Sequence, residues 1–132
     1  RTCDAAGSTM LHICGISAYP PNPKLEKTAL GALDSVPWKY HKNTLSAVQE
    51  LKKRGIAIFS VEQTPDSIDY RTVEYPTPVA LVLGHERNGV NQLVLDQSDT
   101  VIHIPMRGTK SSLNVATAAG IILFEATRDN PD

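Results

Sequence analysis

The stretch Val79–Leu83 (VALVL), followed at once by Gly84–Gly89 (GHERNG), decides the fold of this chain. A short, continuous apolar run of this kind is typical of a strand whose two faces are both buried in a parallel sheet. The polar segment that follows lies where open α/β sheets place their ligands, directly after the carboxyl end of a strand. We therefore expect an inner strand of a parallel sheet with a candidate binding segment at its end.

Further strand-like and helix-like segments alternate on both sides of this stretch. Strands are predicted at Thr9–Cys14, Val36–Tyr40, Ile56–Val61 and Val101–Ile104. Helices are predicted at Lys24–Leu33, Thr44–Arg54, Asn91–Leu95 and Ser112–Arg128, after the end of another helix at Arg1–Gly7. The intervening Glu62–Pro78 is predicted to be a polar connection. Strands that alternate with helices predict an α/β fold, with a mostly parallel sheet flanked by helices.

The helix predicted at Thr44–Arg54 has clear start and stop signals. Asn43 is a favourable N-cap residue, because its side chain accepts a hydrogen bond from a free backbone N–H of the first turn. Lys52 and Lys53 suit the negative end of the helix dipole, and Gly55 suits a left-handed helix end.

The predicted final helix, Ser112–Arg128, has little polar surface. Its apolar residues are distributed all round the helix axis, a pattern typical of a helix that is buried on several sides. In a domain of this size, a second subunit would supply part of that cover, which favours a homodimer. The alternative is a helix central to the core of its own chain.

The composition excludes several classes of protein. The chain has 132 residues, of which 41% are hydrophobic and 20% charged, as expected of one globular domain. No apolar run reaches ~18 residues, so no membrane-spanning helix is predicted. Cys3 and Cys14 are too few for a disulfide scaffold and indicate buried thiols in a reducing, cytoplasmic compartment. The cysteines and the four histidines have no metal-ligand spacing, so no metal is expected.

The charge is distributed unevenly, although the formal net charge of −1 gives no global signal for nucleic acid. The segment Lys24–Arg54 holds seven basic residues against three acidic ones. It also contains Trp38, Tyr40 and His41, so one hypothesis is that it contacts phosphates and stacks on bases. The alternative is a solvated helix face beside a core tryptophan.

Three segments follow predicted strands and are therefore expected to share one pocket: Glu62–Thr64, Gly84–Gly89 and Pro105–Asn114. Familiar nucleotide-binding motifs do not account for them. Gly84 and Gly89 have the spacing of a P-loop, but Val90-Asn91 follows where Lys-Ser/Thr is required. Lys110 does not follow a glycine directly, and no Gly-x-Gly-x-x-Gly motif occurs.

Three blocks of the sequence together resemble the SpoU (TrmH-like) class of the SPOUT superfamily, which contains RNA ribose 2′-O-methyltransferases. Arg1–Gly7 is similar to the end of the first family motif, Asn-x-Gly-x-x-x-Arg-Thr-Ala, with Cys3 where alanine is usual. Leu83–Gly89 is similar to the second motif, Leu-Gly-x-Glu-x-x-Gly. Ile104–Gly108 with Ser112–Val115 is similar to the third, although Ala116 stands where many members have serine.

The resemblance covers residues 1–132 as one methyltransferase domain. Because the Asn and Gly of the first motif are absent, we expect natural sequence to precede Arg1. The resemblance implies a deep C-terminal trefoil knot, S-adenosylmethionine bound by the knotted loops, and a homodimer. In such a dimer, Arg1 of one subunit lies near the cofactor of the other.

The resemblance also implies the roles of individual residues. The candidate cofactor-binding residues are Val61, Leu83, Gly84, Ile104, Met106, Ser112 and Leu113. The candidate catalytic residues are Arg1, Glu86, Ser112 and Asn114. Arg1 is expected to stabilise the negative charge that develops on the ribose oxygen, and Ser112 and Asn114 to orient substrate and cofactor. Glu86 is expected to pair with Arg1 or Asn114; the alternatives are an ion pair between loop and helix for Glu86 and helix capping for Ser112.

The predicted function is methyl transfer from S-adenosylmethionine to a ribose 2′-hydroxyl of tRNA or rRNA. The alternative is a catalytically silent RNA-binding module that keeps the cofactor pocket. A nucleotide hydrolase or kinase is disfavoured by the missing P-loop.

Overall fold

Strands β3 (Ala57–Val61) and β5 (Val79–Leu83) pair in parallel, from Ala57 opposite Val79 to Val61 opposite Leu83. On the other side of β3 lies β6 (Thr100–His103), and β6 pairs in turn with the short strand β4 (Ile68–Asp69). All these pairings are parallel, and the strand order is β4-β6-β3-β5. The prediction of a parallel sheet is confirmed in this computed structural model, which describes residues 2–14, 36–84 and 88–130.

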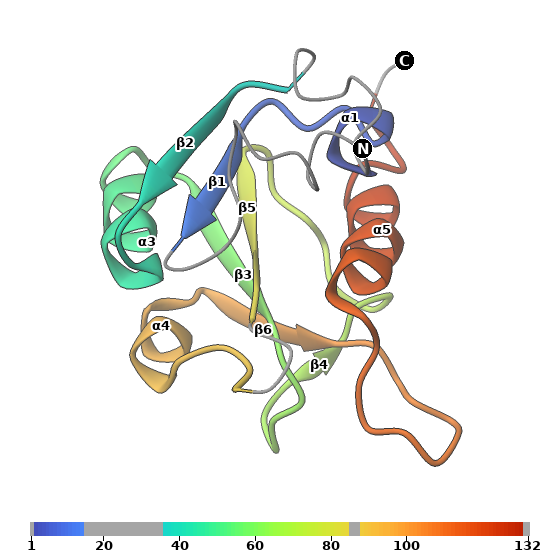
Figure 1. Cartoon of the computed structure of the whole chain (residues 1–132). Helices are drawn as coiled ribbons and strands as arrows, with labels where there is room; N and C mark the ends of the chain where they lie inside the picture. Colours follow the sequence, from blue (N-terminus) through green and yellow to red (C-terminus); the bar gives the residue numbers. More distant parts are fainter. Residues whose placement is uncertain (1, 15–35, 85–87, 131–132) are drawn as a thin grey trace, which may run out of the picture. The chain divides into compact units, whose positions relative to one another are not determined.

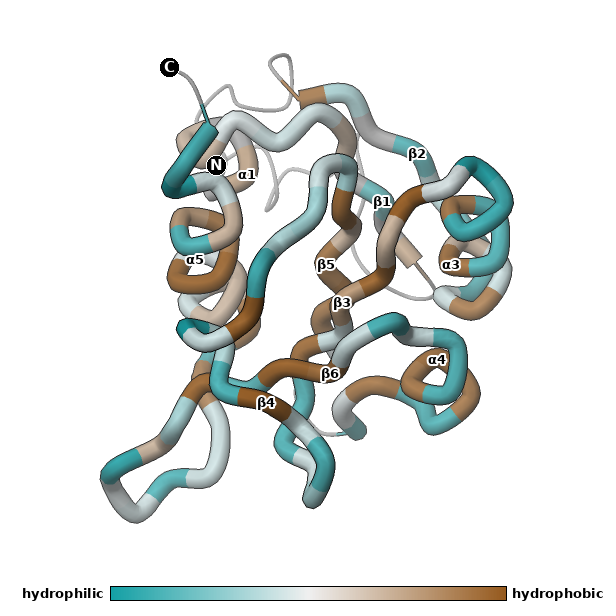
Figure 2. Tube along the Cα trace, turned by 180° about the vertical axis from the view of Figure 1, so that it is seen from behind, coloured by the Kyte–Doolittle hydropathy of each residue, from teal (hydrophilic) through white to brown (hydrophobic). Residues whose placement is uncertain are grey.

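Both faces of this sheet are covered. Helices α4 (Gln92–Gln97) and α5 (Val115–Ala126) lie on opposite sides of it (Figure 1), and they contact β3 and β5 respectively. Ile58 and Phe59 are adjacent in β3 and point to opposite faces, yet both are buried. Phe59 packs with Ile102 and with Ile122 of α5, and Figure 2 shows the apolar residues concentrated in β3, β5 and β6.

The chain divides into two compact units, Arg1–Ala47 and Val48–Asp132. The first unit holds α1 (Thr2–Ala5) and two paired parallel strands, β1 (Leu11–Cys14) and β2 (Trp38–His41). Within this unit, the rings of His12 and His41 share a hydrogen bond of 2.8 Å between Nδ1 and Nε2. The second unit contains the four-stranded sheet with α4 and α5. Helix α3 (Thr44–Lys53) begins in the first unit and ends in the second.

The predicted helix signals are confirmed where the structure describes them. The Asn43 side chain accepts a hydrogen bond from the backbone N–H of Ser46 at 2.8 Å, and α3 ends before Gly55, whose φ is 78°. The buried side of α3 is formed by Ala47, Val48 and Leu51. The helix predicted at Lys24–Leu33 lies outside the described residues.

Two segments differ from the sequence prediction. Glu62–Pro78 is not only a connection, because Ile68 and Asp69 pair with β6; a two-residue strand with an exposed Ile68 is too short to give a recognisable pattern. The final helix begins at Val115 rather than Ser112, because the side chain of Asn114 accepts hydrogen bonds from the N–H groups of Ala116 and Thr117 and so caps the helix.

One prediction of burial is wrong in degree. Cys3 and Cys14 are half-buried free thiols rather than fully buried ones, and burial raises the pKa of Cys14 against a smaller, lowering effect of its hydrogen bond with Thr44. In α5, Ile122 is buried, but Phe124 is 53% exposed. None of the described helices is long and apolar enough to cross a membrane.

Candidate functional site

The three segments identified from the sequence leave the same edge of the larger sheet. Parallel strands end at one edge, and the register sets Val61, near the end of β3, opposite both Leu83 of β5 and Ile102 of β6. The candidate residues Val61 and Leu83 are therefore direct neighbours across the sheet. Ile104 follows β6 on the other side of β3, so the sheet topology brings three of the predicted cofactor-binding residues together.

Glu62 connects the end of β3 to the segment that follows β5. Its carboxylate oxygen Oε2 accepts a hydrogen bond of 3.1 Å from the backbone N–H of Val90. Gly89 has a φ of 66°, and a Cβ added there would lie 2.7 Å from the same oxygen. The Glu62 carboxylate is thus packed directly against the Gly89–Val90 backbone.

Gly84 has no room for a side chain. A Cβ at this position would lie 2.3 Å from the carbonyl carbon of Gly89 and 2.5 Å from the backbone nitrogen of Val90. Close approach of backbone is the expected reason for glycine. Here the approaching backbone belongs to the chain itself, so the packing of Gly84 against Gly89 and Val90 is sufficient to require glycine.

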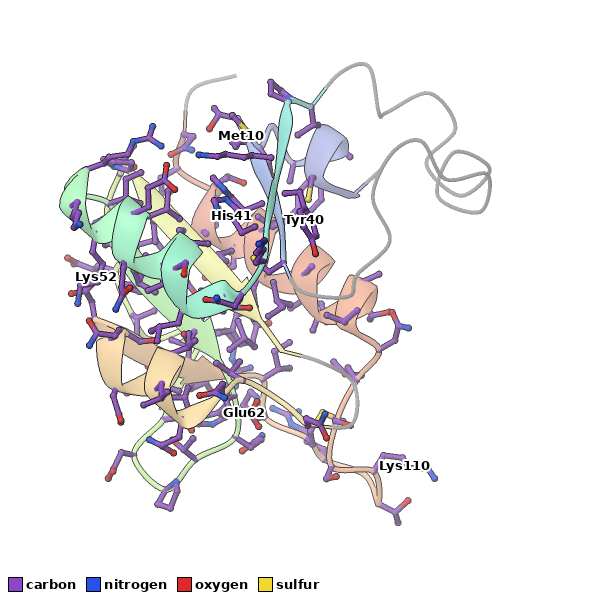
Figure 3. The ribbon with its side chains drawn as sticks, turned by 60° about the vertical axis from the view of Figure 1, so that its left-hand side comes forward. Met10, Tyr40, His41, Lys52, Glu62 and Lys110 are labelled. Carbon is purple, nitrogen blue, oxygen red and sulfur yellow. The ribbon has the colours of Figure 1, made fainter. Side chains whose placement is uncertain are left out.

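Gln63 connects β3 to the segment that follows β6. Its side-chain Nε2 donates a hydrogen bond of 3.2 Å to the carbonyl oxygen of Ile104. Beyond Ile104 and the half-buried Met106, the chain is exposed from Arg107 to Asn114. Figure 3 shows Lys110 at the outer end of this segment, well away from Glu62. Leu113, with 38% of its surface exposed, offers an apolar side chain to solvent.

Ser112 and Asn114, two predicted catalytic residues, lie in the last part of this exposed segment. The side-chain oxygen of Asn114 accepts hydrogen bonds of 2.9 and 3.2 Å from the backbone of α5. That oxygen serves the helix cap, whereas the NH₂ group of the same carboxamide can still donate. Ser112 is exposed and does not cap the helix, so the capping alternative for Ser112 is wrong.

Arg1 and Glu86 lie outside the described residues, so the predicted contacts of these two side chains are not among the structural observations. The other eight positions in the predicted site lie in the second unit. Among the described residues, no group of three or more His, Cys, Asp or Glu side chains is placed to hold a metal ion.

His103 and Ser67, near the same edge, have the separation of a nucleophile and its base but not the required geometry. The ring Nδ1 of His103 lies 2.9 Å from Oγ of Ser67, and that hydroxyl donates a hydrogen bond of 2.8 Å to the carbonyl oxygen of Thr64. The same oxygen also accepts a hydrogen bond of 3.2 Å from the backbone N–H of Thr64, so the Ser67 hydroxyl is bonded to both backbone groups of Thr64. The pair stabilises the turn after β3 and is not an activated serine.

Glu62 and Gln63 lie in a segment that the sequence predicts to be part of the pocket, but neither residue is assigned a role there. Each bonds to a different neighbouring segment, to Val90 and to Ile104 respectively. Their position at the end of a strand was the available signal, and it marked Glu62–Thr64 as part of the site. The partners of the two side chains depend on the strand order β6-β3-β5, which the sequence does not specify.

The basic face of α3 is partly used within the protein. Nζ of Lys52 donates a hydrogen bond of 2.8 Å to the carbonyl oxygen of Gln97, the last residue of α4. Lys53 and Arg54 are exposed at the end of the same helix. Lys53 is therefore a better candidate for contacting a phosphate than Lys52.

A parallel sheet whose carboxyl edge gathers three polar segments defines an α/β domain with a ligand site at that edge. Comparison with known proteins identifies which α/β domain this is. The sequence model of the SpoU rRNA Methylase family matches residues 1–124. The chain belongs to this family.

Individual relatives agree with the family match. The tRNA (guanosine(18)-2′-O)-methyltransferase of Thermus thermophilus is 37% identical over 128 residues, which cover 97% of this chain and 65% of the relative. The 23S rRNA (guanosine-2′-O-)-methyltransferase RlmB of Ralstonia nicotianae is 34% identical over 128 residues, covering 97% and 51%. This chain thus spans about half to two thirds of the length of these relatives.

Solved structures share the fold. An AdoMet-bound rRNA methyltransferase from Sinorhizobium meliloti superposes with a TM-score of 0.92 at 30% identity, covering 100% of this chain and 50% of that one. The TrmH/SpoU tRNA modifying enzyme of A. aeolicus gives a TM-score of 0.86 at 35% identity, covering 96% and 64%. The α/β fold with its parallel sheet is therefore that of SpoU/TrmH proteins.

Proposed function

We propose that this chain is the catalytic domain of an enzyme that transfers a methyl group from S-adenosylmethionine to a ribose 2′-hydroxyl of tRNA or rRNA. The observation that carries the proposal is the convergence of the second and third family motifs at one sheet edge, with Leu83–Gly84 and Ile104–Met106 on either side of β3. The relatives named above are tRNA and rRNA ribose methyltransferases, which supports the same activity here.

The residues at this edge fit the proposed cofactor. Ile104 and Met106 are half-buried and Leu113 is 38% exposed, so apolar side chains are available for a purine ring. Backbone N–H and C=O groups beyond the strand ends at Val61 and Leu83 can bond to the ring edge. Ser112, exposed beside Leu113, adds a hydroxyl group. When bound, S-adenosylmethionine supplies a methyl group that is already activated by its positive sulfonium.

With an activated methyl donor, the protein mainly has to orient the ribose hydroxyl and help it lose its proton. We assign Arg1 to this task, because a guanidinium stabilises the negative charge that develops on the oxygen. An arginine side chain stays protonated, which argues against its acting as a true base. Ser112 and the NH₂ group of Asn114 orient the substrate, and Glu86 pairs with Arg1 or Asn114.

We also propose that residues 1–132 form one SpoU-type domain with a C-terminal trefoil knot. The family match runs through both compact units, which supports a single domain. The strand order is not sequential, which is compatible with a knotted chain: β6 is the last strand in the sequence, yet it lies between β3 and β4.

We propose that the enzyme is a homodimer with α5 in the interface. Phe124 is 53% exposed on this largely apolar helix, whereas Ile122 is buried in the core with Phe59 and Ile102. Phe124→Asp should therefore yield a folded monomer, while Ile122→Asp should unfold the domain. Light scattering with circular dichroism distinguishes the two results. A monomeric wild-type protein at micromolar concentration would contradict the dimer.

RNA is the proposed partner, and the cytoplasm the proposed location. The exposed Lys53 supports an RNA contact on α3, and Lys53→Ala should weaken RNA binding modestly and reduce its salt dependence by about one charge. Filter binding at several salt concentrations measures both quantities. An unchanged salt slope would place the RNA elsewhere.

The proposed activity is tested by Arg1→Ala in the full-length protein. Transfer of labelled methyl groups to bulk tRNA and rRNA should fall by about a hundredfold or more, as when one preorganised donor at an oxyanion is removed. Affinity for S-adenosylmethionine should stay nearly unchanged, because a contact made only in the transition state does not affect binding of the cofactor. A wild-type protein that binds cofactor and RNA without methylating either substrate would instead be a silent RNA-binding module.

A further inference from the structure

We propose that Glu62 is a positioning residue, whose carboxylate holds the backbone at Gly89–Val90 in the arrangement that the cofactor site requires. This inference rests on the proposed function and adds a residue that lies outside the three family motifs. Its starting point is the hydrogen bond of 3.1 Å from the backbone N–H of Val90 to Oε2 of Glu62.

The hydrogen bond between Glu62 and Val90 joins the segments that follow β3 and β5. The backbone N–H of Glu62 donates to the carbonyl oxygen of Ile102 at 2.9 Å, so the main chain at Glu62 still follows the sheet. Its side chain reaches to the opposite side, toward Val90, which is 9% exposed. Glu62 is thereby fixed at its backbone by β6 and at its carboxylate by the segment after β5.

Two glycines make this arrangement possible. At Gly89 a Cβ would collide with the Glu62 carboxylate, and at Gly84 a Cβ would collide with the backbone of Gly89 and Val90. The Gly89–Val90 backbone is therefore packed between Gly84 and the Glu62 carboxylate, and neither glycine leaves space for a Cβ atom. Because Gly84 packs against Gly89 and Val90, any shift of Val90 away from Glu62 changes the position of the Gly84 backbone. Gly84 belongs to the proposed cofactor site, so such a shift alters that site.

Removing the acceptor leaves the backbone N–H of the buried Val90 without its partner. The cost of such an unsatisfied donor corresponds to about a tenfold to a hundredfold change in an equilibrium constant. The bond is made to a backbone N–H, so its strength depends on the reach of the side-chain oxygen. A glutamine has the same reach and an oxygen acceptor, whereas an aspartate keeps the charge but is shorter by one methylene group.

The test compares Glu62→Ala, Glu62→Gln and Glu62→Asp in the full-length protein, with Glu74→Ala, an exposed glutamate between β4 and β5, as the matched control. S-adenosylhomocysteine is the probe, and its affinity is measured by titration calorimetry. We expect at least a tenfold loss for alanine and aspartate, and a change of less than threefold for glutamine and for the control. In methyl transfer, KM for S-adenosylmethionine should rise in the alanine and aspartate variants while kcat changes by less than threefold.

Hydrogen exchange at the Val90 amide reports the contact without any ligand, and it should speed up in the alanine and aspartate variants. If Glu62→Ala unfolds the domain, the comparison of aspartate with glutamine remains decisive. Wild-type affinity in the alanine or aspartate variant, or a loss in glutamine but not in aspartate, overturns the positioning role. If the wild-type protein itself does not bind S-adenosylhomocysteine, the proposed cofactor is wrong and the inference falls with it.

Discussion

The segments that follow β5 and β6 leave the same edge of the sheet but are held in different ways. After β5, Gly84 packs against the Gly89–Val90 backbone, and the Glu62 carboxylate bonds to Val90. After β6, the chain is held near its two ends, by Gln63 at Ile104 and by the Asn114 cap at α5, and it is exposed from Arg107 to Asn114.

This contrast suggests that the two segments contribute differently to binding in the proposed site. Where Gly84 packs against the backbone of Gly89 and Val90, the chain is already in place, so a ligand that binds at these residues pays little conformational entropy. The exposed segment carries Ser112, Leu113 and Asn114, the side chains proposed to contact cofactor and substrate, and ordering it on binding costs more. We infer that the β5 side defines the position of the cofactor and that the β6 side adapts to it.

The largest effect should come from replacing a glycine by alanine in the segment after β5, compared with the same replacement in the segment after β6. In Gly84→Ala, the new Cβ meets backbone atoms that cannot move independently, so we expect a loss of more than about 2 kcal/mol in unfolding free energy. In the matched variant Gly108→Ala, nothing lies within 4 Å of the new Cβ, and the change should stay within about 0.5 kcal/mol. Urea denaturation measures both. Equal effects of the two variants would show that the segments are held alike.

A smaller effect should come from the two asparagine caps. Asn91 accepts a hydrogen bond from Leu93 at the start of α4, and Asn114 accepts two at the start of α5. Replacing either by alanine should cost about 1 kcal/mol of stability. Asn114→Ala should also lower methyl transfer, whereas Asn91→Ala should not.

The comparison of the caps separates the two roles of Asn114. Asn114→Asp keeps the oxygen that caps the helix and loses the NH₂ donor, so it should restore stability without restoring activity. Thermal unfolding and labelled methyl transfer together give the result. Full activity in Asn114→Asp would limit this residue to capping.

The smallest effect should arise away from both segments, at the exposed pair of Asp69 and Arg71. The Arg71 guanidinium bonds to the Asp69 carboxylate at 2.7 Å and lowers the pKa of Asp69 from 3.8 to about 2. Because the pKa is lower in the folded state, the pair stabilises the fold above about pH 4, and this contribution disappears as the pH falls toward 2.

Titration of the Asp69 carboxyl carbon by NMR measures this directly. The midpoint should lie near 2 in the wild type and return toward 3.8 in Arg71→Ala. Methyl transfer near neutral pH should be the same in both proteins, because β4 carries none of the proposed site residues. A titration midpoint that does not move in Arg71→Ala would remove the ion pair as the cause.

Much of the fold follows from short-range patterns in the sequence. The apolar run Val79–Leu83 predicts β5 with its observed ends, and Asn43 and Gly55 predict the ends of α3. These features depend on residues close together in the chain. The two-residue strand β4 escapes prediction because it is defined by pairing with β6, and the start of α5 is misplaced because both Ser112 and Asn114 are good N-cap residues.

The site is predictable in its location but not in its internal contacts. Strand ends mark where Glu62–Thr64, Gly84 and Ile104 lie, since ligands of open α/β sheets bind there. The bond between Glu62 and Val90 joins residues that are 28 positions apart, so it requires the strand order. The resemblance to a family adds the chemistry, which patterns of hydrophobicity and charge do not contain.

The most direct test of the central claim is hydrogen exchange of the full-length protein with and without S-adenosylhomocysteine, read by mass spectrometry along the chain. We expect ligand to slow exchange in peptides that cover Leu83–Gly84 and Ile104–Asn114. The second region should gain more protection, because its residues from Arg107 to Asn114 are exposed in the free chain. Protection confined to α4 or β4, with no change at either segment, would contradict a cofactor site at the carboxyl edge of the sheet.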